Sequence, residues 1–384
     1  MLQTLNVWTR SFDDKKAIDI IYTDFSKAFD RVPHKKLLDV LRSFGISGAN
    51  LSWIRSFLTG RNQSVTIDGL QSSPLEVISG VPQGSVVGPL FFILFIEDVQ
   101  SCCLNNCNIG LYADDSKLYS SNANDLQESL NRFEQFVRMR QLQLAANKCQ
   151  HLTISKKDSD LVFFLEGQPI AKANKVKDLG IVISSDLKWS HHITQLRRKG
   201  YTRCYQILRS FRSKNIWIYI KAYITYVRPI LETDSVIWSP HYIKDVNALE
   251  SVQRLYLKSV CRRCNLKYST YADRLNALGL KTLEYRRWYF DIVFVYKLIN
   301  NLVDLDKNDF FSFETFSYNL RRHNLYLKKP NYKLDVLKYF FANRVINPWN
   351  NLPSNIVNSP SLDIFRKRLN NFNLQTVQSM TICF

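Results

Sequence analysis

The sequence predicts an α+β protein in which helices back an antiparallel sheet, followed by a mainly helical, basic region. Two observations predict this architecture. Over the first half, expected elements follow the order strand, helices, strand pair, helix, strand, which is typical of helices packed behind an antiparallel sheet. Composition then changes after Asp186, because residues 187–229 contain no acidic residue. We therefore expect two domains, 1–187 and 188–384.

The first expected element is a buried strand in KAIDIIYTDF, residues 16–25, which ends at Asp24. Its near-continuous apolar run bounded by charges is typical of such a strand. A helix should follow over residues 32–44, since apolar residues recur at helical spacing and Gly45 provides a stop. A second short helix is expected over 50–59, closed by Gly60.

Turn signals and apolar periodicity predict the next elements. The Asp68-Gly69 pair predicts a hairpin turn. A loop rich in Gly and Pro then leads into a hydrophobic helix that should begin near Pro89. An amphipathic helix is expected over 124–144. The other expected elements are a hairpin in LYADDSKLY and strands in HLTIS and DLGIVIS.

Asp114 and Asp115 lie side by side in this strand-like LYADDSKLY segment. Two adjacent carboxylates repel each other and lose hydration when partly buried. A tight turn would accommodate them, because Asp tolerates turn backbone. A divalent cation would also stabilise them, since it needs hard oxygen ligands. If the strand that ends at Asp24 is a neighbour, three carboxylates converge, and two Mg²⁺ ions bridging them would suit phosphoryl transfer.

Net charge indicates the class of partner. The 384 residues include 52 Lys plus Arg against 33 Asp plus Glu, giving a charge of +19. Such an excess points first to nucleic acid and then to an anionic membrane, with an inert basic surface as the alternative. The longest apolar run, 86–96, is too short to span a membrane, and no secretory signal is recognisable. We therefore expect an intracellular protein that is not a membrane protein.

The acid-free segment 187–229 interleaves basic and aromatic side chains. We expect it to bind a nucleic-acid backbone, with a solvated helical face as the alternative. The residues predicted to make these contacts are Arg197, Arg198, Lys199 and Arg203.

The 8 cysteines are scattered and are expected to be reduced thiols without disulfide partners. Cys261 and Cys264 form CRRC, a spacing found in zinc sites. No second pair of suitable spacing follows closely, so a zinc site is the less favoured interpretation.

An ordered series of motifs resembles the reverse transcriptase of non-LTR, LINE-type retrotransposons, particularly the jockey-like group. YTDFSKAFDRVPH resembles the first palm motif of that family, SGVPQGSVVGPLFFILFIEDV the second and YADD the third. LAANKCQ resembles the fourth and KDLGIVISSDLKWSHHI the fifth. Beyond the palm, YVRPILETDSVIWSP, LESVQRLYLKSV, LGLKTLEYRRWYFDIVFVYKLINN, RRHN and WNNLPSNIVNSPSLDIFRKRL resemble the thumb and following region. The resemblance spans nearly the whole chain in the expected order.

The resemblance implies a polymerase palm followed by a helical thumb and C-terminal region. It implies that Asp24 and Asp114 are the principal ligands of two Mg²⁺ ions, for which Mn²⁺ could substitute, with Asp115 as the third acid. Lys148 would protonate the pyrophosphate leaving group or would only pair with an acid. Neither alternative is preferred by the sequence.

The nucleotide contacts implied by the resemblance are Phe25, Phe29, Gln83 and Gly84. Phe29 aligns with the aromatic gate that excludes a 2′-hydroxyl, with a core phenylalanine as the alternative. Asp30 is expected to cap or brace the adjoining helix. Leu179, Gly180 and the WSHHI stretch would form the primer grip. His191 and His192 are adjacent, a spacing that does not suit chelation of one metal.

The function implied by the resemblance is RNA-directed DNA synthesis, in which a primer 3′-hydroxyl attacks the α-phosphate of a dNTP. The partners would be an RNA template, a DNA primer and dNTPs, and the location would be the nucleus. Few residues precede Asp24, so we expect the fingers to be largely missing and activity to be impaired. The alternative is a non-catalytic remnant that only binds nucleic acid. An RNA-synthesising enzyme is disfavoured by Phe29.

Overall fold

The structure is a computed structural model that describes residues 1–156, 160–314 and 323–372. The chain forms two compact units, of which one is Lys15–Val176 and the other combines Met1–Asp14 with Lys177–Phe384. Residues 1–14 and 177–187, which the sequence assigned to the first domain, therefore lie in the second unit. The functional division at residue 187 stays a prediction. Arg321 and Arg322 of the RRHN motif lie outside the described residues.

The unit Lys15–Val176 is built on a five-stranded sheet with the strand order β11-β8-β1-β7-β6. Its strands are β1 (Ile18–Thr23), β6 (Cys107–Tyr112), β7 (Asp115–Ser120), β8 (Gln150–Ile154) and β11 (Ala171–Lys172). β1 pairs antiparallel with β7 and β8, and β6 pairs antiparallel with β7. The edge strand β11 runs parallel to β8. The predicted antiparallel sheet is confirmed, and β11 adds one parallel pair at its edge.

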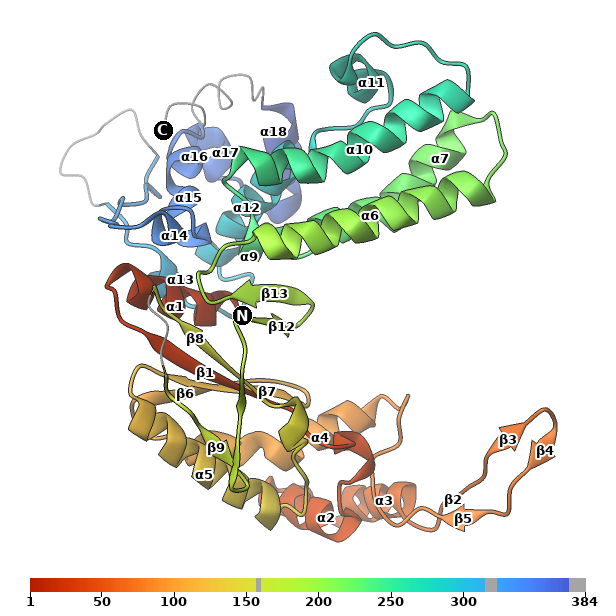
Figure 1. Cartoon of the computed structure of the whole chain (residues 1–384), viewed down its shortest axis with the longest axis vertical. Coiled ribbons are helices and arrows are strands. Elements are labelled where there is room, and N and C mark those ends of the chain that lie inside the picture. The colour runs from red at the N-terminus through yellow and green to blue at the C-terminus, as the bar shows by residue number, and fades with distance from the viewer. Residues whose placement is uncertain (157–159, 315–322, 373–384) are drawn as a thin grey trace. The chain divides into compact units, whose positions relative to one another are not determined.

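Helices pack on this sheet and on one another, as Figure 1 shows. They are α2 (His34–Ser43), α3 (Gly48–Leu58), α4 (Val87–Ile96) and α5 (Ala123–Met139). α5 packs against β7, and α2 packs against both α3 and α4. The shared core buries Ile21 and Leu118 from the strands together with Phe92 and Phe133 from the helices. The predicted α+β fold with helices behind the sheet is confirmed.

Two helix boundaries differ from those expected. α4 begins at Val87, so Pro89 lies in its first turn instead of starting it. α5 ends at Met139, before residue 144, because Gln141 adopts a left-handed backbone with φ 58°. Both differences are local and leave the order of elements unchanged.

The segment between α3 and α4 contains two short strand pairs. β2 (Asn62–Gln63) pairs with β5 (Leu75–Glu76), and β3 (Thr66–Ile67) pairs with β4 (Leu70–Gln71). Asp68 and Gly69 join β3 to β4 with φ values of 49° and 84°. Two successive positive φ values are typical of the tight turn that matches strand twist. The predicted Asp68-Gly69 turn is confirmed.

Four further strands complete the sheet structure of the described residues. They form the pairs β9–β10 and β12–β13. Their bounds are β9 (Phe164–Leu165), β10 (Gln168–Pro169), β12 (Lys175–Asp178) and β13 (Ile181–Ser184).

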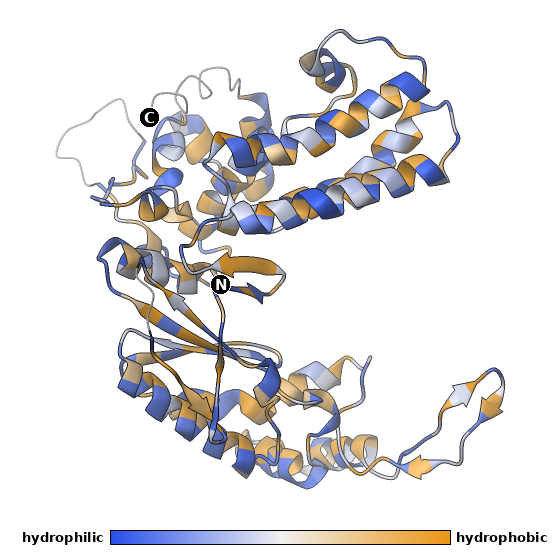
Figure 2. Cartoon of the chain, viewed as in Figure 1, coloured by the Kyte–Doolittle hydropathy of each residue, from blue (hydrophilic) through white to orange (hydrophobic). Residues whose placement is uncertain are grey.

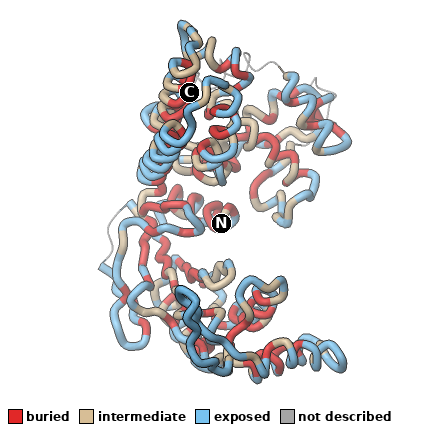
Figure 3. The backbone as a smooth tube through the Cα atoms, turned by 90° about the vertical axis from the view of Figure 1, so that its right-hand side faces the viewer, coloured by how far each residue is buried: buried red, intermediate tan, exposed pale blue. Residues whose placement is uncertain are grey.

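The second unit is mainly helical, as predicted. Its helices are α1 (Leu2–Asp13), α6 (Ser190–Ser210), α7 (Ile216–Ala222), α8 (Arg228–Glu232), α9 (Ser235–Trp238), α10 (Ile243–Arg263), α11 (Tyr271–Ala277), α12 (Leu283–Ile299), α13 (Lys307–Phe310), α14 (Asp335–Lys338), α15 (Phe341–Arg344), α16 (Ile346–Asn350), α17 (Ser354–Val357) and α18 (Leu362–Asn371). A π-helical segment, Tyr223–Val227, joins α7 to α8. Along these helices buried residues alternate with exposed ones (Figure 3). None of the described helices is both long and apolar enough to cross a membrane.

α6 and α10 run side by side in this unit (Figure 1). The contact depends on Gly200 of α6, where a Cβ atom would lie 3.0 Å from Leu231 and 3.1 Å from Val252. A larger side chain at this position would push the neighbouring elements apart. The close approach buries one face of α6 and leaves its other face exposed.

α1 is fixed to the C-terminal part of the chain. The Asn6 and Arg10 side chains donate hydrogen bonds to the Asp309 carbonyl oxygen at 2.8 and 2.6 Å. The Asp13 carboxylate accepts hydrogen bonds from the backbone N–H groups of Lys333 and Leu334. These contacts explain why the first residues of the chain belong to the second unit.

Candidate active site

The register of β1 and β7 brings two predicted acids to the same end of the sheet. Thr23 pairs with Ser116 in this antiparallel ladder, and their hydroxyls share a hydrogen bond. Asp24 directly follows Thr23, and Asp115 directly precedes Ser116. In antiparallel strands the next residues after such a pair lie opposite each other. The backbone therefore places Asp24, directly after β1, beside Asp115 of the neighbouring strand β7 at one end of the sheet.

Asp114 lies in the turn that joins β6 to β7. Tyr112 pairs with Asp115 across the hairpin, so Ala113 and Asp114 form a two-residue connection. Ala113 adopts a positive φ of 52°. Asp114 is partly exposed and Asp115 is exposed. The hairpin at this acid pair is confirmed, and its backbone places both residues at the end of the sheet where β1 also ends.

The Asp24 carboxylate forms an ion pair with the side chain of Lys148. Lys148 Nζ lies 3.0 Å from Asp24 Oδ2. The backbone holds the two residues near each other, because Ala145 N–H donates to the Asp24 carbonyl oxygen at 2.7 Å and Lys148 lies in the short 3₁₀ helix Ala146–Lys148. This ion pair is the arrangement expected from the second alternative for Lys148, pairing with an acid.

The predicted acids lie at one end of the sheet, but their side chains are not arranged as a metal-binding site. Among residues 1–156, 160–314 and 323–372, no group of three or more His, Cys, Asp or Glu side chains is arranged so that it could hold a metal ion. The residue types nevertheless fit a hard cation, since carboxylate oxygens are the ligands that Mg²⁺ prefers. The Asp24 carboxylate also already binds one positively charged group, the Lys148 ammonium. The acids therefore suit a divalent cation by donor type.

Phe25 and Phe29 are aromatic residues on the segment that follows β1. Phe25 is 3% exposed and contacts the rings of Phe92 and Phe133 in the core. A side chain buried in this way contacts no ligand in this conformation, so any nucleotide contact of Phe25 would involve its backbone. Phe29 is partly exposed and stacks on Phe92 with ring centroids 4.7 Å apart. Phe29 thus lies at the edge of the core with part of its ring accessible.

The loop 79–84 is fixed to the segment around Asp30 by several hydrogen bonds. Val81 N–H donates to the Phe29 carbonyl oxygen at 2.8 Å, and Gln83 Nε2 donates to Asp30 Oδ1 at 2.9 Å. Gly80 has a φ of +92°, and a Cβ there would lie 2.8 Å from the Asp30 carbonyl oxygen. These hydrogen bonds hold Gln83 near Phe29.

Asp30 braces this loop and does not cap a helix. α2 has Pro33 as its N-cap and no side-chain capping hydrogen bond. The Asp30 carboxylate instead accepts the hydrogen bond from Gln83, and its carbonyl oxygen accepts one from Ser79 Oγ at 2.8 Å. The expected role of Asp30, capping or bracing the adjoining helix, is therefore not the one observed, because its hydrogen bonds brace the loop 79–84 instead.

Gln143, Thr23 and Ser116 also support the site and were not singled out in the sequence. Gln143 Oε1 accepts a hydrogen bond from Arg31, and its carbonyl oxygen accepts one from Ser26 N–H at 2.8 Å. Thr23 and Ser116 pair directly beneath the acids. No local sequence signal marks these residues, because each acts through a partner far away in the chain.

Burial raises the pKa of the Cys149 thiol, which follows Lys148. A backbone hydrogen bond from the Asp24 segment opposes this effect, and the negative charge of Asp24 adds to it. Cys149 is 1% exposed. A buried thiol with a raised pKa is a packing group beneath the acids and not a nucleophile at neutral pH.

The basic residues predicted to bind nucleic acid lie on α6 in the second unit. Arg197, Arg198, Lys199 and Arg203 are exposed, whereas Leu196, Gly200 and Cys204 on the other face are buried. Hydrophilic and hydrophobic residues accordingly alternate along this helix (Figure 2). The Arg197 guanidinium lies over the Tyr201 ring at 5.4 Å. The four basic residues are thus all accessible, although Arg197, Arg198 and Lys199 point in different directions because consecutive helical residues are about 100° apart.

The residues expected to form a primer grip occupy a turn and the start of α6. Leu179 and Gly180 join β12 to β13 with φ values of 48° and 87°. His191 is exposed, whereas His192 is buried and its Nδ1 accepts a hydrogen bond from Val182 N–H at 3.3 Å. Burial, with a smaller contribution from the Lys199 charge, lowers the pKa of His192 to about 4. His192 is therefore a neutral packing residue at neutral pH.

Comparisons with known proteins match the region that contains this site. Residues 3–183 match the family model described as reverse transcriptase (RNA-dependent DNA polymerase). The RNA-directed DNA polymerase from mobile element jockey of Drosophila funebris is 30% identical over 214 residues, which are 52% of this chain and 23% of that protein. The probable RNA-directed DNA polymerase from transposon X-element of Drosophila melanogaster is 24% identical over 289 residues, 69% of this chain and 32% of that protein. The chain thus spans about a quarter to a third of these relatives.

A solved structure of apo telomerase from Candida tropicalis is also similar. It is 11% identical, with a TM-score of 0.41, over 80% of this chain and 54% of that chain.

Proposed function

We propose that this chain, which carries a reverse transcriptase domain over residues 3–183 related to those of non-LTR mobile elements, extends a DNA primer with dNTPs on an RNA template. The observation that carries the proposal is the pairing of β1 with β7, which sets Asp24 beside the Asp114-Asp115 turn. Enzymes of this family use divalent metal ions. Acids at one end of a sheet, inside the matched region, are what such chemistry requires.

Asp24, Asp114 and Asp115 would hold two Mg²⁺ ions. When bound, such ions supply positive charge that stabilises the attacking and leaving oxygens of phosphoryl transfer. The chain's own contribution is to hold the carboxylates on rigid strand ends. Lys148 would neutralise Asp24 before the ions bind and would then be free to donate a proton to the pyrophosphate. Its 63% side-chain exposure gives the ammonium room to move.

Phe29, Gln83 and Gly84 would receive the sugar and base of the incoming nucleotide. The hydrogen bonds between the loop 79–84 and residues 29–32 support this assignment, because they keep Gln83 near Phe29. Gly84 has a φ of +81°, and no atom lies within 4 Å of the position that a Cβ would occupy, so backbone can approach a ligand there. Phe25 would contribute through its backbone only.

Residues 188–384 would form the thumb and C-terminal region and hold the template–primer duplex through α6, with Leu179, Gly180 and the start of α6 as the primer grip. We also propose a nuclear location, where a DNA primer is available.

The direct test is primer extension by the full chain with Mg²⁺, an RNA template, a labelled DNA primer and dNTPs. Extension that requires template, primer and metal supports the proposal. Binding of the template–primer without extension, in Mg²⁺ and in Mn²⁺, would contradict it and favour a protein that only binds nucleic acid.

Substituting Phe29 by valine should raise the use of ribonucleotides relative to deoxynucleotides by at least about tenfold, because the ring would no longer collide with a 2′-hydroxyl. The measurement is the ratio of kcat/KM for a ribonucleotide and its deoxy counterpart in primer extension. Phe57→Val is the matched control, since Phe57 is also partly exposed and stacks on an aromatic ring, that of Trp53. An unchanged ratio in Phe29→Val would assign Phe29 to the core alone.

Replacing Arg197, Arg198 and Lys199 together with alanine should weaken duplex binding and flatten its salt dependence. Each phosphate that the variant no longer neutralises lowers the steepness of log affinity against log salt by about 0.9 on duplex DNA, with the same sign for a hybrid. Fluorescence anisotropy across a salt series measures this slope. A slope equal to that of the unmodified chain would mean that these residues are only solvated.

A further inference from the structure

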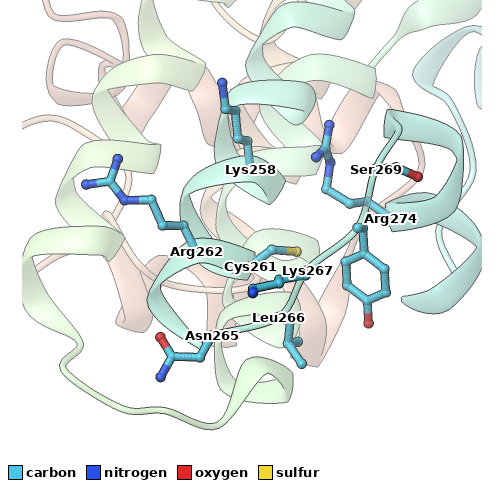
Figure 4. A pocket seen from close by; sticks show the side chains of 9 residues that line it. Lys258, Cys261, Arg262, Asn265, Leu266, Lys267, Ser269 and Arg274 are labelled. Atoms are coloured by element: carbon cyan, nitrogen blue, oxygen red, sulfur yellow. The ribbon is translucent and has the colours of Figure 1, made fainter.

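A basic pocket lies at the C-terminal end of α10, away from the four basic residues of α6. It has a volume of about 840 Å³. α10, the connection 264–270 and α11 form its walls. The lining residues are Lys258, Cys261, Arg262, Asn265, Leu266, Lys267, Tyr268, Ser269 and Arg274. Figure 4 shows these side chains, with Lys258 and Arg262 rising from α10.

All of the charged residues that line this pocket are basic. Lys258, Arg262, Lys267 and Arg274 contribute to the lining, and no acidic residue does. Lys258, Arg262 and Lys267 are exposed. Within the described part of the chain, no carboxylate forms an ion pair with any of these four residues. Asp273 lies beside the lining, because its carboxylate accepts a hydrogen bond from Ser269, but the charged residues of the lining itself are all basic and favour an anionic ligand.

Arg274 adds a second, independent sign of a ligand. Its Nε atom is buried and has no hydrogen-bond partner within the described residues. A buried donor without a partner costs free energy, and an anion or a water would satisfy it. Guanidinium groups suit phosphate oxygens, because their donors form a planar fork.

The CRRC motif belongs to this pocket, which argues against zinc there. Cys261 is 4% exposed and lies among the four cations. Burial raises the pKa of its thiol, and the Arg274 charge lowers it by less. A zinc ion would add positive charge to an already cationic site and would need deprotonated thiols.

The other lining groups favour a nucleotide unit over a bare anion. Tyr268 offers an aromatic ring for base stacking, and Asn265 offers amide hydrogen-bonding groups, whereas the Ser269 hydroxyl already donates to Asp273 Oδ2 at 2.6 Å. The volume also exceeds what one phosphate needs and falls in the range typical of small-molecule sites. An unpaired strand can present a base and a phosphate together, whereas a duplex keeps its bases stacked.

We propose that this pocket binds a phosphate group of a single-stranded nucleic acid, with an adjacent base against Tyr268. The proposal rests on the proposed function only in taking nucleic acid as the ligand. Binding in the pocket needs no dNTP, no metal and no synthesis. The phosphate would come from the strand backbone or from a 5′ terminus.

The test compares the full chain with the triple variant Lys258→Ala/Arg262→Ala/Lys267→Ala. Its matched control is Lys244→Ala/Lys328→Ala/Lys367→Ala, which removes three other exposed lysines of the same unit. Fluorescence anisotropy is measured with a short labelled single strand carrying a 5′-phosphate or a 5′-hydroxyl, in the presence of EDTA. Circular dichroism melting checks that both variants fold.

The pocket variant should bind the single strand at least about tenfold more weakly than the control variant, and its salt slope should fall by about 0.7 for each phosphate that it no longer neutralises. An equal loss of affinity for both strands identifies a backbone phosphate, and a loss confined to the 5′-phosphate strand identifies the terminus. Tyr268→Leu should weaken strand binding several-fold without changing competition by inorganic phosphate.

Equal affinities of the pocket and control variants would overturn the proposal, as would an equal loss of affinity for a sulfated polyanion that lacks bases. Arg274→Lys provides a further check, because it keeps the charge but removes Nε, and affinity equal to that of the unmodified chain would exclude the buried Arg274 Nε as a phosphate donor. Since no synthesis is measured, failure of primer extension leaves this result intact.

Discussion

Replacing Asp114 with asparagine is expected to slow primer extension about a thousandfold. The loss of one carboxylate charge from a site that must hold divalent cations costs the transition state about 4 kcal/mol, which corresponds to that factor. The fold should remain intact, because Asn tolerates turn backbone and Asp114 is partly exposed in a two-residue turn. The measurement is single-turnover extension with saturating template–primer. Asp24→Asn should cause a loss of similar size.

Asp68→Asn is the matched control for this experiment. Asp68 also lies in a two-residue hairpin turn, but its carboxyl is in the exposed β3–β4 segment. Its extension rate should equal that of the unmodified chain. If Asp114→Asn and Asp68→Asn gave the same rate, the proposed role of Asp114 would be wrong. Rescue of Asp114→Asn by raised Mg²⁺ concentration would indicate weakened metal binding as the cause.

Replacing Gly80 with alanine is expected to lower the free energy of unfolding by about 3 kcal/mol or more. Two effects add. The φ of +92° is unfavourable for any residue with a Cβ, and the new Cβ would lie 2.8 Å from the Asp30 carbonyl oxygen and 2.9 Å from its Cα. Backbone atoms cannot move aside as a flexible side chain can. Urea titration followed by circular dichroism measures the change.

Gly60→Ala separates these two effects. Gly60 has a φ of +70°, but no atom lies within 4 Å of the Cβ position. Alanine there should cost only the conformational term, about 1 kcal/mol. A loss of stability in Gly80→Ala no larger than in Gly60→Ala would show that the loop 79–84 is not held against the Asp30 segment. In the folded Gly80→Ala variant, nucleotide use should also weaken, since Gln83 would shift with the loop.

Features that depend on local backbone and side-chain chemistry could be predicted from the sequence alone. The Asp68-Gly69 turn could be predicted because two residues with positive φ are needed to join tightly paired strands. The first strand, expected to end at Asp24 and observed to end at Thr23, and the hairpin at Asp114 could be predicted from apolar runs bounded by polar residues. The exposure of the basic residues of α6 followed from the same reasoning, since charged side chains avoid burial.

Helix ends were less predictable from the sequence. The apolar pattern of α5 continues past Met139, but the chain turns at Gln141, where hydrogen bonds to residues of the last helical turn replace further helix. The helix could continue through residue 144 or end in the turn at Gln141, and both arrangements satisfy local hydrogen bonds. Burial of Leu142 and Leu144 favours the shorter helix.

Tertiary structure alone sets which distant residues meet. The pairing of Thr23 with Ser116 sets Asp24 beside Asp115, and a slip of one residue would turn one acid to the other face. The same holds for the ion pair of Lys148 with Asp24, the brace from Asp30 to Gln83, and the burial of Phe25. Each of these depends on contacts between sequence-distant segments, whose register is fixed by burial of the whole core and not by any short stretch of residues.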